Sequence, residues 1–147
     1  NNLPGLPPGG DDQAKVDEVT SGIKAILDLM QQKAPGATII LMGITPRNDL
    51  GPGIWLTINR INQRLSQFAD GRRIRYLNIN DRLADREGRL LPEMTTDGLH
   101  LSVKAYQVWA DALKPVFREL LGPPADTDQA PPPTGDPGAK AASAPAR

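Results

Sequence analysis

The run T-I-I-L-M-G at residues 38–43 points to the architecture more strongly than any other part of the chain. It is short, rich in β-branched residues and free of polar alternation, which is typical of a strand buried on both faces in a parallel sheet. The run R-I-R-Y-L-N-I-N at residues 73–80 predicts a second strand. Because parallel strands need long crossover connections, helices are expected around these two runs.

Three segments carry apolar residues at the spacing of an amphipathic helix. The first runs from about Ala14 to Pro35-Gly36, the second ends at Asp70-Gly71, and the third begins at about Ser102, a favoured N-cap residue. Pro115 should kink the third helix or loosen one of its turns. The three apolar stripes are Val16, Val19, Ile23, Ile26, Leu27 and Met30; Ile54, Ile58, Ile61, Leu65 and Phe68; and Tyr106, Trp109, Leu113, Val116, Phe117 and Leu120.

The order is helix, strand, helix, strand, an irregular stretch over 81–99, and a last helix. This order predicts a parallel α/β fold built by right-handed crossovers. Two strands make a narrow sheet for three helices, so the pattern resembles the second half of a three-layer domain. Residues 122–147 are mostly Pro, Ala, Gly and small polar residues. We therefore expect one domain over 1–121 and a disordered tail or linker over 122–147.

Composition excludes several classes of function. The 17 basic and 17 acidic residues balance, which argues against nucleic-acid binding. There is no cysteine and only one histidine, so thiolate sites are excluded and metal catalysis fits poorly. No apolar run is long enough to span a membrane, and no phosphate-binding loop follows either strand. We expect no cofactor and no metal. The sequence decides neither the compartment nor the oligomeric state, and a bacterial periplasmic or secreted protein is compatible with it.

The single histidine, His100, lies in T-T-D-G-L-H-L-S at residues 95–102. Asp97 precedes it by three residues, so the carboxylate can reach Nδ1 across one turn and leave Nε2 free as a general base. The pair lies between a strand and a helix, where open α/β sheets bind their ligands. The same spacing also fits an Asp-Gly turn followed by a half-buried histidine that packs beside Leu99 and Leu101.

The motif D-G-L-H-L-S, followed by an aromatic residue at Tyr106, resembles the last sequence block of the GDSL/SGNH hydrolases. Asn1-Asn2 resembles the end of that family's Gly-x-Asn-Asp block, with Asn2 where Asp is more usual. Residues 37–47, A-T-I-I-L-M-G-I-T-P-R, are similar to the next strand and loop, especially in the platelet-activating-factor acetylhydrolase-like branch. Residues 58–65, I-N-R-I-N-Q-R-L, are similar to the helix after it, and the resemblance covers about 1–121.

This resemblance implies a serine-type carboxylic ester hydrolase, an esterase or lipase, that acts on short acyl esters such as acetyl esters of a small molecule or carbohydrate. It implies His100 as the base that deprotonates the serine, Asp97 as the residue that orients His100, and Asn1 as a donor to the oxyanion. Removing such a donor typically lowers the rate by ~10²–10³. Asn1 can also be an ordinary residue of a Pro/Gly loop.

The family's Gly-Asp-Ser nucleophile block and its oxyanion glycine belong upstream of Asn1, and the sequence contains neither. Ser21 and Ser66 lie in predicted helices, Ser102 is better explained as an N-cap, and Ser143 lies in the tail. We therefore expect these residues alone to be inactive. On the resemblance they form the C-terminal portion of a three-layer α/β/α, flavodoxin-like SGNH domain whose N-terminal strands are missing.

Two other interpretations stay open. The chain can be a non-catalytic α/β binding or scaffold module, or it can be an incomplete, marginally folded unit that associates through exposed apolar surface. The loop at residues 45–49 either borders the active-site cleft or forms an ordinary proline turn with a solvated Arg47. Trp55 is interpreted as a packing residue, and Trp109 as part of the core.

Overall fold

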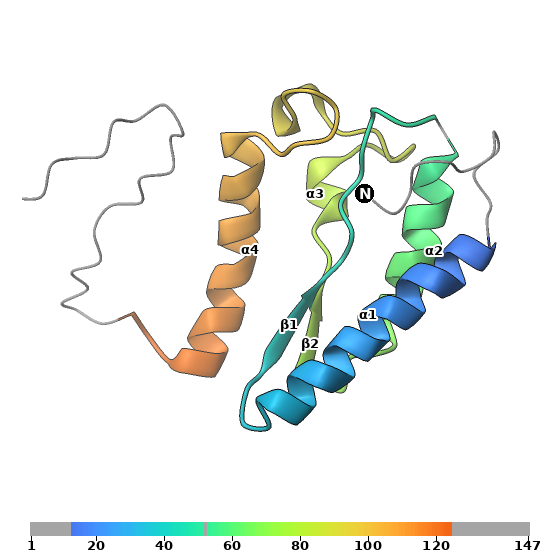
Figure 1. Cartoon of the computed structure of the whole chain (residues 1–147). Coiled ribbons are helices and arrows are strands. Elements are labelled where there is room, and N and C mark those ends of the chain that lie inside the picture. Colours follow the sequence, from blue (N-terminus) through green and yellow to red (C-terminus); the bar gives the residue numbers. More distant parts are fainter. Residues whose placement is uncertain (1–12, 52, 125–147) are drawn as a thin grey trace, which may run out of the picture.

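The computed structural model describes residues 13–51 and 53–124, and Asn1 lies outside them. The chain forms a small α/β unit around two strands that lie side by side at its centre (Figure 1). Its elements are α1 Gln13–Lys33, β1 Ile39–Met42, α2 Ile54–Ser66, β2 Ile74–Leu77, α3 Asn80–Leu83, the 3₁₀ helix η1 Pro92–Met94 and α4 Val103–Leu121. The order and the approximate bounds of the three long helices agree with those predicted from the sequence.

The two strands are parallel, with Ile39 opposite Ile74 and Met42 opposite Leu77. Hydrogen bonds from Ile39 N to Arg73 O (2.7 Å) and from Gly43 N to Leu77 O (2.9 Å) frame the pair. Because alternate residues of a strand point to opposite faces, each strand divides its side chains between two layers of helices. The parallel α/β class is thus confirmed, with a sheet of two strands within the described residues.

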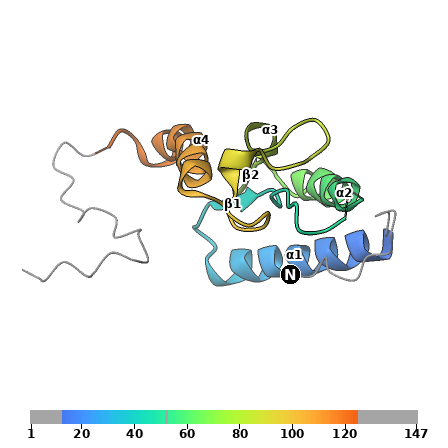
Figure 2. The same cartoon turned by 90° about the horizontal axis from the view of Figure 1, so that it is seen from above.

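One face of the sheet packs on α1 and α2. Ile39 and Ile74 contact Leu27 of α1, and Leu41 and Tyr76 pack against the cluster formed with α2. The buried members of that cluster are Val16, Ile54, Ile58, Ile61 and Leu65. Seen from above, α1 and α2 lie on one side of the strands and α4 lies on the other (Figure 2).

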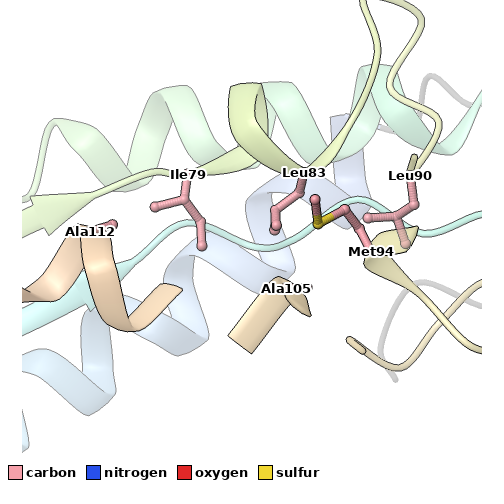
Figure 3. Packing of buried hydrophobic residues seen from close by; sticks show 6 residues of the cluster. All are labelled: Ile79, Leu83, Leu90, Met94, Ala105 and Ala112. Atoms are coloured by element: carbon pink, nitrogen blue, oxygen red, sulfur yellow. The ribbon is translucent and has the colours of Figure 1, made fainter. Parts of the chain in front are cut away.

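The other face packs on α4. Arg75 of β2 donates two hydrogen bonds from its guanidinium to the carboxylate of Glu119 on α4, at 2.6 and 2.7 Å. The end of β2, with Leu77 and the following Ile79, joins a second apolar cluster with α3, η1 and α4. Figure 3 shows its buried members Ile79, Leu83, Leu90, Met94, Ala105 and Ala112. This cluster fixes the start of α4, which directly follows the D-G-L-H-L-S motif of residues 97–102.

The two edges of the sheet differ. At the outer edge of β2, Asp70 Oδ1 accepts a hydrogen bond from Ile74 N (2.9 Å), and Ile74 O accepts one from Asp70 N (3.2 Å). This turn therefore uses both backbone hydrogen-bonding groups of Ile74, the first residue of β2 whose N–H and C=O point away from β1. On β1, the alternation places the N–H and C=O groups of Ile40 and Met42 on the edge away from β2, where no strand pairs with them in the described part of the chain.

Several sequence predictions need correction. Only Ile39 of the TIILMG run is buried, because the sheet has one open edge beside β1. The second strand ends at Leu77, since Asn78 Oδ1 accepts a hydrogen bond from Asn80 N and turns the chain into α3. Four residues predicted on apolar stripes are exposed: Ile26, Met30, Tyr106 and Phe117. Pro115 lies inside α4, and the kink or loosened turn expected there stays a prediction.

We expect the Ile58→Ala substitution to destabilise the fold by about 2–5 kcal/mol, because it leaves a cavity between α1, α2 and the sheet. Ile58 is 0% exposed. Urea denaturation followed by circular dichroism measures the change. Leu56→Ala is the matched control on the same helix, since Leu56 is 56% exposed and such a site changes stability by about 0.5 kcal/mol or less. Equal losses in both variants would contradict the packing described.

Candidate active site

Asp97 and His100 form a hydrogen-bonded pair at the surface. His100 Nδ1 lies 2.6 Å from Asp97 Oδ2, and the two side chains are 74% and 51% exposed. A carboxylate at this position favours the tautomer with the proton on Nδ1 and leaves Nε2 as the basic nitrogen. The structure brings together the two residues that the sequence analysis paired. It does not support the alternative of a half-buried histidine packed beside Leu99 and Leu101.

The turn that carries the pair is held by hydrogen bonds within itself. Asp97 Oδ1 accepts from Leu99 N (2.9 Å) and His100 N (2.8 Å), so one carboxylate both shapes the turn and contacts the imidazole. Thr95 Oγ1 accepts from Gly98 N (2.8 Å) and donates to His100 O (2.9 Å). Gly98 has φ +85°, a conformation that favours glycine.

The helix that follows fixes the end of this turn. Thr95 and Leu101 form an isolated antiparallel bridge, and Ser102 then caps α4. The Ser102 side chain accepts a hydrogen bond from Ala105 N at 3.2 Å and donates to Glu93 O. Ser102 thus acts as the N-cap predicted from the sequence.

The contact with His100 lowers the pKa of Asp97 far below its usual range, because the imidazole first, and then the backbone N–H groups of His100 and Leu99, stabilise the carboxylate. The loop after β1 carries a second acid. Asp49 accepts two hydrogen bonds from the Arg47 guanidinium, which lower its pKa, while the negative charge of Asp97 acts in the opposite direction. Two carboxylates therefore lie on neighbouring loops, and an arginine pairs with one of them.

In the unfolded chain Asp97 should have the usual aspartate pKa of about 3.9. In the folded protein we expect its carboxyl group to stay ionised well below that pH. Because the folded pKa is depressed, the pair stabilises the fold above the unfolded pKa, and this contribution is lost as pH falls through the folded pKa. Carbon-13 NMR of the Asp97 carboxyl carbon during an acid titration measures this. A midpoint at or above 3.9 would contradict the geometry described.

The loop after β1 lies against the turn that carries the pair. Asn48 N donates to Gly98 O at 2.6 Å, which joins the carboxyl end of β1 to the functional turn. The side chain of Arg47 is only 9% exposed, so the interpretation of this loop as a turn with a solvated arginine is wrong. Arg47 and Leu99 both line a cavity of about 550 Å³ between this loop and α1. The loop therefore borders the site.

Two further sequence interpretations concern aromatic residues. Trp55 packs against Gly88, where an added Cβ would come within 2.0 Å of the indole ring. This contact supports its interpretation as a packing residue, although Trp55 also lines a second cavity together with Arg47. Trp109 packs against the cluster of Figure 3 and stacks with Tyr106 at a centroid distance of 6.0 Å.

Residues 13–51 and 53–124 contain neither a candidate metal-binding cluster nor a helix able to span a membrane. No three His, Cys, Asp or Glu side chains gather there in a group that could hold a metal ion. No described helix is both long enough and apolar enough to cross a bilayer.

The turn that carries Asp97 and His100 lies inside a segment of the chain that matches a known protein family. A model of the GDSL-like lipase/acylhydrolase family matches residues 1–108. The chain belongs to this family. Among curated proteins, this GDSL-family chain is similar to the bovine platelet-activating factor acetylhydrolase IB subunit alpha1, with 27% identity over 106 residues. The match covers 71% of this chain and 46% of that protein, so the chain spans about half the length of the curated relatives it matches.

Two solved structures share the fold. A GDSL-like lipase from Bacteroides thetaiotaomicron is 20% identical, with a TM-score of 0.61 over 72% of this chain and 54% of that one. The esterase domain of an ORF1 protein from a zebrafish retrotransposon is 18% identical, with a TM-score of 0.61 over 75% and 62% of the two chains. At these identities the likeness shows the fold, which for this chain is an α/β unit matching part of an SGNH hydrolase.

Proposed function

We propose that this GDSL-family chain supplies the base and its orienting acid to a serine-type carboxylic ester hydrolase. The observation that carries this proposal is the 2.6 Å contact between Asp97 Oδ2 and His100 Nδ1 in an exposed turn at the carboxyl end of the sheet. With Nδ1 engaged, Nε2 accepts the proton of a serine hydroxyl as that oxygen attacks an ester carbonyl. Nε2 then returns the proton to the leaving alcohol.

The nucleophilic serine, in this proposal, lies outside these 147 residues. Ser21 and Ser66 lie in α1 and at the end of α2, and the hydroxyl of Ser102 is engaged at the N-terminus of α4. None of these three follows a strand on a sharp turn into a helix, which is where such hydrolases present their nucleophile. Asn1 is assigned as an oxyanion donor through the family resemblance alone. On this proposal the 147-residue chain does not hydrolyse esters by itself.

The proposal includes a wider sheet. The open edge of β1 and the exposed Ile26 and Met30 of α1 match what further parallel strands and a helix would cover in a three-layer, flavodoxin-like domain. The domain ends with α4 at Leu121, after which Gly122 has φ +84°. Residues 122–147 are assigned to a tail or linker.

The proposed substrates are esters of short acyl groups, acetyl above all, with a small molecule or a carbohydrate. Support comes from the similarity to the curated platelet-activating factor acetylhydrolase IB subunits, which is distant. The cavity of about 550 Å³ beside Leu99 has a mostly apolar wall from Val19, Ile23 and Ile44.

The test uses the product of the complete reading frame that contains this chain. We expect it to hydrolyse p-nitrophenyl acetate and to react with a fluorophosphonate probe, with mass spectrometry placing the adduct on a serine upstream of Asn1. The 147-residue chain serves as the comparison and should show neither property. A folded complete protein without hydrolysis and without an adduct would favour the binding-module interpretation, and an adduct on a serine of this chain would refute the external nucleophile.

A further inference from the structure

Asn48 connects three loops at the carboxyl end of the sheet. Its backbone N–H donates to Gly98 O at 2.6 Å, the peptide next to Asp97. Its side chain accepts from Leu90 N at 2.8 Å and donates to Leu90 O at 3.2 Å. The amide of one side chain thus satisfies both backbone groups of Leu90, as a neighbouring strand would.

The partner of the Asn48 side chain is fixed in the core. Leu90 is 4% exposed, belongs to the cluster of Figure 3 and forms a bridge with Ala84. Arg47 precedes Asn48, and its largely buried side chain pairs with Asp49, which follows Asn48. Asn48 is therefore fixed by its bonds to the buried Leu90 and by the ion pair within its own loop. Because it is fixed, it restrains the exposed turn that it contacts.

The contact with the functional turn is close-packed. A Cβ at Gly98 would lie 3.3 Å from the Cβ of Asn48 and 3.4 Å from Asp49 N. The other hydrogen bonds of Asp97 and Thr95 described above stay within the turn, so they shape it without placing it on the sheet. Placement comes from Asn48 on one side and from the start of α4 on the other.

We infer that Asn48 is a positioning residue for the Asp97–His100 pair. By fixing the Gly98 peptide, Asn48 sets the direction from which the Asp97 carboxylate meets Nδ1 of His100. The side-chain amide acts through the backbone of its own residue and does not touch substrate. The structural part of this inference stands without the proposed function, whereas its consequence for rate rests on that function.

The test reads the imidazole directly, because His100 is the only histidine in the chain. Long-range proton–nitrogen-15 NMR on the 147-residue chain gives the tautomer of the neutral ring. We expect the Nδ1–H tautomer in the original chain and a shift toward Nε2–H in Asn48→Ala. Asn48→Asp keeps the acceptor for Leu90 N and loses the donor to Leu90 O, so it should fall between the two and serves if the alanine variant does not fold.

Asn59→Ala is the control, since it removes the same side chain from α2 and should leave the tautomer unchanged. An unchanged tautomer in both folded Asn48 variants, or an equal shift in Asn59→Ala, would overturn the inference. In the complete enzyme, Asn48→Ala should lower kcat by up to about 10²-fold with little change in KM. Absence of activity in the unmodified enzyme would refute the proposed function, while the NMR result would still decide the role of Asn48.

Discussion

On the proposed function, the His100→Ala variant of the complete protein is expected to lose about 10⁶-fold in kcat, the largest effect of any substitution in this chain. Without the imidazole, the serine hydroxyl has no group to take its proton at the moment of attack, and the leaving alcohol has no donor. Steady-state hydrolysis of p-nitrophenyl acetate measures the loss. Because the side chain is 74% exposed, its removal should leave the unfolding midpoint close to that of the original protein.

Thr96→Ala provides a matched control for this variant. Thr96 is exposed in the same turn, so the substitution tests whether any small change there reduces activity. We expect its kcat to stay within about threefold of the original value, an effect below 1 kcal/mol. Comparable activity in the His100→Ala and original enzymes, with both folded, would refute the assignment of the base.

The second large effect is expected for Asp97→Asn, at about 10⁴-fold in kcat. An asparagine keeps an Oδ1 that accepts from Leu99 N and His100 N, so the turn should retain its shape. Its NH₂ group then faces Nδ1 in place of the carboxylate oxygen. An NH₂ donor favours the imidazole tautomer with the proton on Nε2, which cannot act as a base toward the serine.

Kinetics and NMR together check this variant. The nitrogen-15 shifts of His100 should report the reversed tautomer, and KM should change little because the substitution alters no binding surface. The double variant Asp97→Asn/His100→Ala should be no slower than His100→Ala alone, since the two residues act as one unit. A loss below tenfold for Asp97→Asn, or a further loss in the double variant, would contradict the orienting role.

Local patterns made much of this fold predictable. Helical spacing located α1, α2 and α4, and the β-branched run located β1, because burial of one face acts on neighbours along the chain. The strand β2 was predicted too long because the Asn78 side chain turns the backbone at its end. A single hydrogen bond of this kind leaves no periodic pattern in the sequence. Ile26 and Met30 follow the apolar pattern of α1 and yet are exposed, so the pattern alone did not predict which of its residues are buried.

In the candidate site too, contacts between residues close in sequence could be predicted, and contacts between distant residues could not. Asp97 and His100 are three residues apart, so their contact follows from the geometry of one turn and could be predicted. Asn48 lies 42 residues from Leu90 and 50 from Gly98, and an asparagine in a loop usually indicates only a turn. Its contacts depend on how three loops meet in space. The sequence signal was therefore limited to the loop's place after a strand.

The unequal edges of the described sheet also determine on which side further strands can add. On the outer edge of β2, the backbone groups of Ile74 are already hydrogen-bonded to the Asp70 turn. Tyr76 is therefore the one residue of this four-residue strand whose backbone N–H and C=O could pair with another strand on that side. Within the described residues β1 therefore offers the longer free edge, with the backbone groups of Ile40 and Met42, and the further strands of the proposed wider sheet would add on that side, with β2 left as its last strand.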